Sequence, residues 1–317
     1  MSDIPKFVEF HEEGVREGFQ IETEIYPLDR RAKLIEALAE SGLSQIQVGS
    51  FVSPKWVPSM ADTPDLFAAI NKREDVSYTA LWLNKKGFFN ALEVPEVDLK
   101  GQLLFYATDE FSQHNNACTA TEMRDRQVEW LDLYQQNDVT PSNAYLMVAF
   151  GCNFHGDVPV ERITEWAVWL RDLFAERRLP LPNVYLADTV GWATPLEMRR
   201  RIAAVREVIP DARIGLHLHD TRGAGAANVL AALEMGVDLF DSSVAGLGGC
   251  PFAGHGAHKA AGNICTEDMV FMMHEMGIET GIDLDALIDA ALLAEDIIGR
   301  TLNGRIMHSG SLNKYRK

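Results

Sequence analysis

The chain has 317 residues, of which 47% are hydrophobic, and this is enough for a large apolar core,. No apolar run approaches the ~18 uninterrupted residues of a membrane span, so we expect no membrane partner. The formal net charge of −17 at pH 7 repels phosphate backbones, which argues against a nucleic-acid partner,. The cysteines lie far apart without a CxxC pair, which predicts reduced thiols; they are Cys118, Cys152, Cys250 and Cys265,. The segment Met1–Lys6 lacks the features of a signal or transit peptide, so we expect a cytoplasmic protein,.

Short runs rich in β-branched and aromatic residues alternate with amphipathic helical segments along most of the chain. The expected strands are Phe7–His11, Ser44–Val48, Val76–Leu83, Gln102–Ala107, Ala144–Phe150, Val184–Ala187, Ile214–His219 and Val237–Asp241. The expected helices are Arg30–Glu40, Thr121–Gln136, Val160–Glu176, Pro195–Val208, Gly225–Glu234, Thr266–Met276 and Leu284–Leu302. Strand units separated by helices predict a TIM (β/α)8 barrel with additional C-terminal helices; the alternative, a doubly wound sheet, lacks a GxGxxG motif after the first strand. No Pro/Ser-rich linker interrupts the pattern, so we expect one catalytic domain over residues 1–317,.

Polar residues gather where the expected strands end, which is where a barrel places its catalytic groups. His217 and His219 stand two residues apart in an apolar run, so both side chains face the same side of a strand,. They could be core histidines that hydrogen-bond to neighbours, or a pair that binds one metal ion. Asp220 beside them, and acidic residues at other strand ends, favour metal binding. Imidazole, carboxylate and amide ligands suit a divalent ion such as Mg²⁺, Mn²⁺ or Zn²⁺.

Two other segments carry candidate chemistry. Arg16 and Glu17 follow the first strand, where a loop with a cation beside a carboxylate can offer a metal ligand and an oxyanion partner,. A solvated surface pair is the alternative. Cys250 lies in a glycine-rich loop, where a thiol can deliver or accept a proton, unless it is simply a small buried hydrophobic residue,. We interpret the other cysteines as structural.

Three motifs make the sequence similar to a known family. They are residues 51–58 (FVSPKWVP), residues 243–251 (SVAGLGGCP), and Gly262-Asn263 followed by residues 266–268 (TED). Together they resemble 3-hydroxy-3-methylglutaryl-CoA lyase, one of the metal-dependent barrel lyases related to isopropylmalate synthase. The resemblance extends from about Val8 to Leu302.

The resemblance implies a divalent metal held by an acidic residue after the first strand, two histidines and an asparagine. In this sequence the ligands are Glu17, His217, His219 and Asn263. The catalytic residues that it implies are Arg16 for the enolate oxygen, Asp188 for proton transfer at the substrate hydroxyl, Cys250 for protonation of the enolate, and His217. The metal is expected to hold the C3 hydroxyl and a neighbouring carbonyl oxygen and to lower the pKa of the alcohol. Loss of that proton breaks the C2–C3 bond and leaves an acyl-CoA enolate.

The sequence departs from the family pattern at several positions around the substrate. The family has Arg-Asp where this chain has Arg16-Glu17, and it has a glutamate where this chain has Gln47, which cannot ionise,. A lysine of the family is Thr23 here, and the loop His11–Gly14 is longer. The stretch from Cys250 to Asn263 is also longer and adds His255, His258 and Lys259. These changes lie around the substrate rather than in the scaffold, so the family is clearer than the identity of the substrate.

The expected small-molecule partner is an acyl-CoA, and the expected substrate contacts are Gln20, Gln47, Ser50, Lys55 and Asn84. Lys55, with Lys85 and Lys86, is a candidate for the CoA phosphates, although exposed lysines on a solvated face fit the sequence as well,. We expect a homodimer, as is common among such barrels.

The sequence therefore predicts a divalent-metal-dependent carbon–carbon lyase that cleaves a 3-hydroxyacyl-CoA. The first expectation for the substrate is 3-hydroxy-3-methylglutaryl-CoA, which gives acetyl-CoA and acetoacetate. A related tertiary 3-hydroxyacyl-CoA such as citramalyl-CoA is the close alternative. A synthase working in the condensing direction uses the same barrel, but the chain leaves no room for a regulatory domain. A catalytically weakened ligand-binding relative is the alternative that is not an enzyme, and Glu17 and Gln47 motivate it.

Overall fold

The computed structural model describes residues 4–249 and 262–316, and within them the chain forms two compact units. We call Lys100–Leu239 the central unit, and we call Lys6–Leu99 together with the described residues from Phe240 onward the terminal unit. The expectation of a single domain stays a prediction. No described helix has both the length and the apolar character that crossing a membrane requires.

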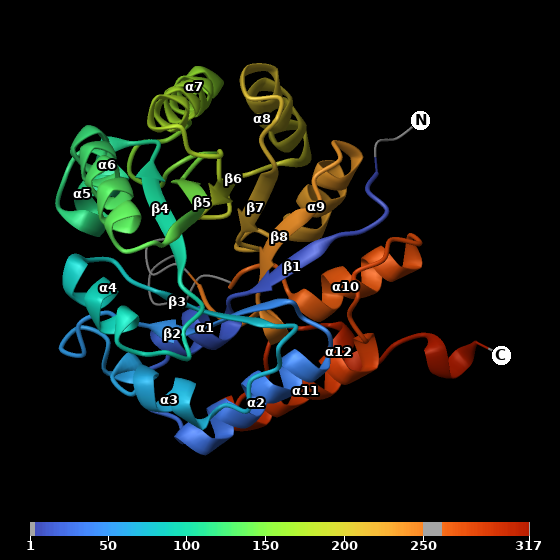
Figure 1. Cartoon of the computed structure of the whole chain (residues 1–317). Coiled ribbons are helices and arrows are strands. Elements are labelled where there is room, and N and C mark those ends of the chain that lie inside the picture. Colours follow the sequence, from blue (N-terminus) through green and yellow to red (C-terminus); the bar gives the residue numbers. More distant parts are fainter. Residues whose placement is uncertain (1–3, 250–261, 317) are drawn as a thin grey trace. The chain divides into compact units, whose positions relative to one another are not determined.

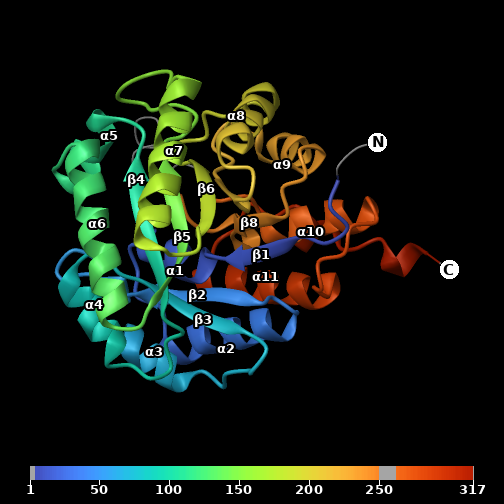
Figure 2. The same cartoon turned by 45° about the horizontal axis from the view of Figure 1, so that its top comes forward.

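The central unit consists of parallel strands and the helices that connect them. Its strands are β4 (Lys100–Tyr106), β5 (Thr140–Met147), β6 (Asn183–Asp188) and β7 (Ile214–Leu218). Its helices are α5 (Asp109–Asn116), α6 (Ala120–Gln136), α7 (Val160–Arg177), α8 (Pro195–Val208) and α9 (Gly225–Glu234). Figures 1 and 2 show α6, α7 and α8 lying over these strands. The strands are in register in parallel, so the carboxyl ends of β6 and β7 lie at the same edge,.

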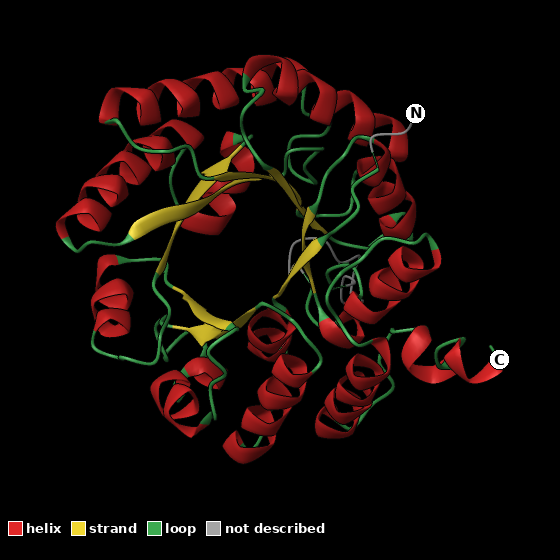
Figure 3. Cartoon of the chain, turned by 45° about the vertical axis from the view of Figure 1, so that its right-hand side comes forward, coloured by secondary structure: helices red, strands yellow, loops and turns green. Residues whose placement is uncertain are grey.

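The terminal unit is built in the same way from the two ends of the chain. Its strands are β1 (Glu9–Glu12), β2 (Gln45–Ser50), β3 (Ser77–Leu81) and β8 (Leu239–Ser242). Its α-helices are α1 (Gly14–Ile21), α2 (Leu28–Glu40), α3 (Thr63–Ala69), α4 (Lys85–Leu92), α10 (Thr266–Glu275), α11 (Leu284–Ile298) and α12 (Ile306–Ser309). Short 3₁₀ helices are η1 (Pro58–Met60), η2 (Val244–Gly246) and η3 (Asn313–Tyr315). In Figure 3 the helices, drawn in red, lie outside the yellow strands.

The order of the strands defines the fold class. All eight belong to one sheet in the order β3-β2-β1-β8-β7-β6-β5-β4, and the pairs with a defined register are parallel. Neighbours are consecutive in sequence except for β1 and β8, the first and last strands. This is the strand order of a (β/α)8 barrel, so the predicted TIM barrel with additional C-terminal helices is confirmed,.

The largest error in the expected strands is at β5, which begins at Thr140 rather than at Ala144. The additional residues are three polar residues and a proline, and they pair with the start of β4, where Lys100 lies opposite Thr140. Burial at this end of the strand is incomplete, so the apolar pattern that identifies a strand is missing there even though the backbone pairs,.

The sequence does not predict the helix α1, which carries two of the candidate site residues. The sequence predicts a loop for Arg16 and Glu17, but both lie on α1. Two glycines lower the helix propensity of this short segment, which hides it from a pattern search,. Gly14 is required by packing, because a Cβ there would lie 2.5 Å from Ser243 Oγ and 2.6 Å from Glu12 Oε1. Val15 and Phe19, four residues apart, provide the buried face of the helix,.

Candidate active site

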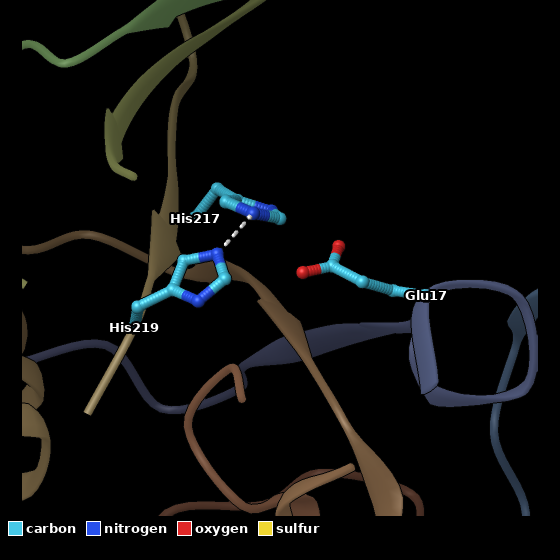
Figure 4. Close-up of side chains that lie close together, drawn as sticks. All are labelled: Glu17, His217 and His219. Atoms are coloured by element: carbon cyan, nitrogen blue, oxygen red, sulfur yellow. Dashed lines mark hydrogen bonds between the residues drawn. The ribbon is translucent and has the colours of Figure 1, made fainter. Parts of the chain in front are cut away.

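The histidine pair at the end of β7 is buried. His217 and His219 are 7% and 4% exposed, and their Nε2 atoms lie 3.3 Å apart. Figure 4 shows the two rings joined by a dashed line. Residues two apart on a strand face the same side, which is why both rings leave the backbone in one direction. At this distance the two nitrogens either share one proton in a hydrogen bond or aim both lone pairs at a common ligand.

Aromatic side chains of the central unit support His217. The ring of Tyr145 meets the imidazole of His217 edge-on, with centroids 6.3 Å apart at an angle of 88°. Tyr145 in turn stacks on Tyr185 at 4.4 Å. Gly215 makes room for this stack, because a Cβ there would lie 2.7 Å from the Tyr185 ring. His217 therefore has a fixed orientation before any ligand binds.

Asp188 is the last residue of β6 and is almost fully buried. Its carboxylate accepts hydrogen bonds from the backbone N–H groups of Trp192 and Ala193, at 2.6 and 3.0 Å. Burial raises the pKa of Asp188 to about 6, although these hydrogen bonds and the nearby charges of Arg222 and His217 lower it,. Such a carboxyl group can gain or lose a proton near neutral pH, which suits general acid–base chemistry.

Oxygen acceptors hold the guanidinium of Arg16 in the terminal unit. Its NH2 group lies 2.7 Å from Glu13 Oε2 and 3.4 Å from Glu17 Oε2. Its Nε donates a hydrogen bond to Gln47 Oε1. Gln47, which the sequence predicts to contact substrate, therefore contacts Arg16. These contacts hold the guanidinium in a defined place, as a donor to a developing negative charge requires.

Glu17 follows Arg16 on α1, and its side chain is mostly buried. The glycines after β8 pass close to it, because a Cβ at Gly248 would lie 3.2 Å from Glu17 Cγ. Gly248 also has a φ of +102°, which side chains rarely adopt,. Figure 4 shows Glu17 extending from α1 with its carboxylate at the tip.

Asn263 is 2% exposed, and in the described part of the chain neither its Nδ2 nor its Oδ1 has a hydrogen-bond partner. A buried amide without partners costs about 1–3 kcal/mol, so such a group in a native fold calls for an explanation. A ligand that binds the amide oxygen provides one. The side chain therefore fits its predicted role at a metal ion.

The other expected substrate contacts have different surroundings in the structure. Ser50 Oγ donates to Gln20 Oε1 at 3.4 Å, so these two side chains meet at the end of β2. Asn84 is the N-cap of α4, where its Oδ1 accepts from the backbone of Gly87 at 2.8 Å,. Lys55 is exposed, with its Nζ 5.5 Å from the ring centroid of Trp56. Cys250, His255, His258 and Lys259 lie outside the described residues, so their roles stay predictions.

Sequence reasoning missed the buried glutamates of the terminal unit. Glu12 accepts hydrogen bonds from the backbone of Gly14 and Val244, both at 2.8 Å, and from Thr266 Oγ1 at 2.7 Å. Burial raises its pKa to about 8, and burial also raises the pKa of Glu267 to about 7,. The sequence alone shows a long polar loop after the first strand. Which of its glutamates face inward depends on the residue at which β1 ends, and local spacing does not give that residue.

The comparisons with known proteins agree with the fold and with the predicted family. A sequence model of the HMGL-like family matches residues 7–293, so the chain belongs to this family and the predicted resemblance is confirmed. A 3-hydroxy-3-isohexenylglutaryl-CoA/hydroxy-methylglutaryl-CoA lyase of Pseudomonas aeruginosa is 38% identical over 96% of this chain and 97% of its own length. The mitochondrial hydroxymethylglutaryl-CoA lyase of Gallus gallus is 35% identical over 96% of this chain and 97% of its own length.

Solved structures show the same barrel. The hydroxymethylglutaryl-CoA lyase structure from Pseudomonas aeruginosa has a TM-score of 0.88 and 37% identity, and the match covers 97% of this chain and 98% of that one. An HMG-CoA lyase from Acinetobacter baumannii in complex with coenzyme A and 3-methylmalate has a TM-score of 0.85 and 33% identity, with 98% of each chain covered. These matches support the TIM-barrel assignment over almost the whole chain.

Proposed function

We propose that the protein is a divalent-metal-dependent lyase that cleaves 3-hydroxy-3-methylglutaryl-CoA to acetyl-CoA and acetoacetate. The observation that carries the proposal is the buried pair His217 and His219, whose Nε2 atoms lie 3.3 Å apart at the end of a barrel strand. The full-length similarity to proteins named as lyases for this substrate supports it. The chemical class, cleavage of a 3-hydroxyacyl-CoA, follows from the same evidence.

The residues that we propose to hold the metal are Glu17, His217, His219 and Asn263. Glu17 offers a carboxylate and the two histidines offer imidazole nitrogens, which are ligand atoms suited to an ion. Among the described residues the buried amide of Asn263 has no hydrogen-bond partner, which supports its place in this set. The carboxylate and amide oxygens of this set suit Mg²⁺ or Mn²⁺, and its imidazoles also suit Zn²⁺. When bound, such an ion polarises the substrate oxygens and lowers the pKa of the C3 hydroxyl.

The remaining residues handle protons and charge. Asp188 accepts the proton of the C3 hydroxyl, because at neutral pH its carboxyl group is largely ionised and still basic enough to hold a proton,. The C3–O bond then becomes the ketone of acetoacetate, and the electrons of the C2–C3 bond pass to the acetyl-CoA enolate. Arg16 donates hydrogen bonds to the enolate oxygen. Cys250, outside the described residues, gives the enolate carbon the proton that completes acetyl-CoA.

In the deciding experiment, purified protein with Mg²⁺ or Mn²⁺ is incubated separately with two thioesters, 3-hydroxy-3-methylglutaryl-CoA and citramalyl-CoA. Acetoacetate from the first, lost on adding EDTA and in the variant His217→Ala, supports the proposal. Pyruvate from citramalyl-CoA without acetoacetate from the first would keep the lyase class and overturn the substrate. No product from either, with no metal bound, would favour a ligand-binding relative that is not an enzyme.

We also propose an acyl-CoA as the small-molecule partner, a homodimer as the assembly and the cytoplasm as the location. The complex of the Acinetobacter baumannii relative with coenzyme A supports the first. Relatives named as cytoplasmic in Mus musculus and as mitochondrial in Gallus gallus are both similar to this chain, so location needs its own test. Light scattering of the purified protein measures the assembly, and a fluorescent fusion shows the location.

A further inference from the structure

The inference concerns Glu13, a buried carboxylate that the proposed reaction does not use. Glu13 is the residue between β1 and α1, and only 2% of it is exposed. Its Oε2 lies 2.7 Å from the NH2 group of Arg16, and Gln47 Oε1 accepts from the Nε of the same guanidinium. Two acceptors from different elements therefore hold one cation.

The backbone fixes Glu13 where it can do this. Its N–H donates to the carbonyl of Ser242 at 2.8 Å, and its carbonyl accepts from the backbone N–H of Glu17 at 2.8 Å. In the register of β1 and β2, Glu12 lies opposite Ile46, and Glu13 and Gln47 are the residues that follow these two. Gln47 thus approaches Arg16 from β2, and Glu13 approaches it from the turn after β1.

The Glu13 side chain does not serve as the cap of α1. Glu13 is the N-cap of α1, where Ser, Thr, Asp and Asn are preferred because their short side chains can bond to the free N–H groups,. Its side chain makes no capping hydrogen bond and turns to Arg16 instead. The helix therefore forgoes a side-chain cap while the guanidinium gains a carboxylate.

Charge balance explains why a carboxylate is needed there. The Arg16 side chain is largely buried, and a buried cation without a nearby anion is strongly destabilised,. Gln47 accepts a hydrogen bond but brings no charge. Glu17 is 3.4 Å from Arg16, but under the proposed function its carboxylate holds the metal. Glu13 is then the carboxylate committed to Arg16.

We infer that Glu13 is a positioning residue of the lyase reaction: its carboxylate, together with the amide oxygen of Gln47, orients the Arg16 guanidinium toward the enolate oxygen. The inference rests on the proposed function. It also predicts that the charge can occupy either acceptor, because Glu13 and Gln47 contact the same guanidinium. One carboxylate between these two positions is required, whichever position carries it.

The test is a charge swap in the full-length protein loaded with Mn²⁺, using Glu13→Gln, Gln47→Glu and the double variant. We expect Glu13→Gln to lower kcat on the order of 10-fold to 100-fold with little change in KM, somewhat less than the loss of a whole oxyanion donor. Gln47→Glu alone adds a surplus negative charge and should lower kcat by about 10-fold, as expected for coupled neighbours. The double variant restores one carboxylate, and its kcat should return to within about 3-fold of the original.

Two measurements separate positioning from folding and from metal binding. Thermal unfolding shows that each variant folds, and electron paramagnetic resonance of Mn²⁺ shows that each holds the ion. Glu161→Gln, on the exposed face of α7, is the matched control for the loss of one charge. An unchanged kcat in Glu13→Gln, or a double variant no better than the single ones, overturns the inference alone. An unsubstituted protein without turnover overturns the proposed function, and this inference with it.

Discussion

The end of β7 and the junction of β1 with α1 present their polar groups in different ways. At β7, both imidazoles come from one strand and lie two residues apart, so strand geometry alone brings His217 and His219 together,. At the junction, Glu13 and Arg16 come from the turn and the helix, and Gln47 comes from the next strand. The first arrangement can be found from sequence spacing, while the second depends on strand register.

The proposed roles differ accordingly. Under the proposed function the histidines of β7 would hold the metal, so their loss should remove the ion and the activity together. The residues around Arg16 orient a charge, so changes there should lower turnover while the ion stays bound. Variants in the two regions therefore test this contrast, and the histidines of β7 should give the strongest loss of activity.

The largest effect is expected for His219→Ala. Losing one imidazole ligand should remove the metal at micromolar concentrations and lower kcat by at least on the order of 10³-fold, since the charge stabilisation by the ion is worth several kcal/mol. Elemental analysis after desalting and steady-state turnover are the measurements. His308→Ala, an exposed histidine paired with Glu295, is the control. If His219→Ala keeps one ion per chain, the metal role of the β7 pair is wrong.

The next effect is expected for Arg16→Lys. Lysine keeps the positive charge, but it lacks the planar fork that donates to Glu13 and Gln47 at once,. We expect kcat to fall on the order of 10²-fold, as for the loss of an oxyanion donor, with the metal still bound. The same assays as for His219→Ala measure this. Loss of the ion in Arg16→Lys would erase the contrast between the two regions.

The two regions also differ in how much of each the sequence predicts. The barrel, the histidine pair and the placement of Asp188 at a strand end follow from periodicity and from the rule that catalytic groups sit at the carboxyl ends of strands,. Asn263 comes only from the resemblance to the family, because a single asparagine has no pattern of its own. The sequence does not predict the partners of Arg16, since α1 is short and glycine-rich and local spacing does not give the register between β1 and β2.

Asp188 provides an intermediate prediction that depends on pH. Because its pKa is about 6, the ionised form that accepts the hydroxyl proton is lost as the pH falls below that value. We expect kcat/KM to decrease about tenfold per pH unit below pH 6, and Asp188→Asn to be about 10²-fold less active, the lower end of what general acid–base catalysis contributes. Rate profiles from pH 5 to 8 measure both effects. An acidic limb that persists unchanged in Asp188→Asn would assign it to another group.

The smallest effect on activity, and a distinct one on stability, is expected for Glu12→Gln beneath α1. The pKa of Glu12 is about 8 in the folded protein and 4.5 in the reference state, so between these values the folded state binds more protons than the unfolded state. The free energy of unfolding therefore falls as the pH rises through this window, by at most about 1.4 kcal/mol per pH unit for this one group. Glu267 adds the same trend up to about pH 7.

Glutamine copies the protonated acid at this position, because its oxygen can still accept from the backbone of Gly14 and Val244 while its NH2 group donates to Thr266,. Urea unfolding at pH 5, 6.5 and 8 should show that Glu12→Gln gains stability relative to the original protein as the pH rises, with kcat within about 3-fold. Equal pH slopes for the two proteins would mean that Glu12 is ionised in the fold. The junction would then hold one more negative charge near Arg16 than the positioning by Glu13 requires. Net charge, and not only the contacts of Glu13, would then distinguish the junction from the β7 pair.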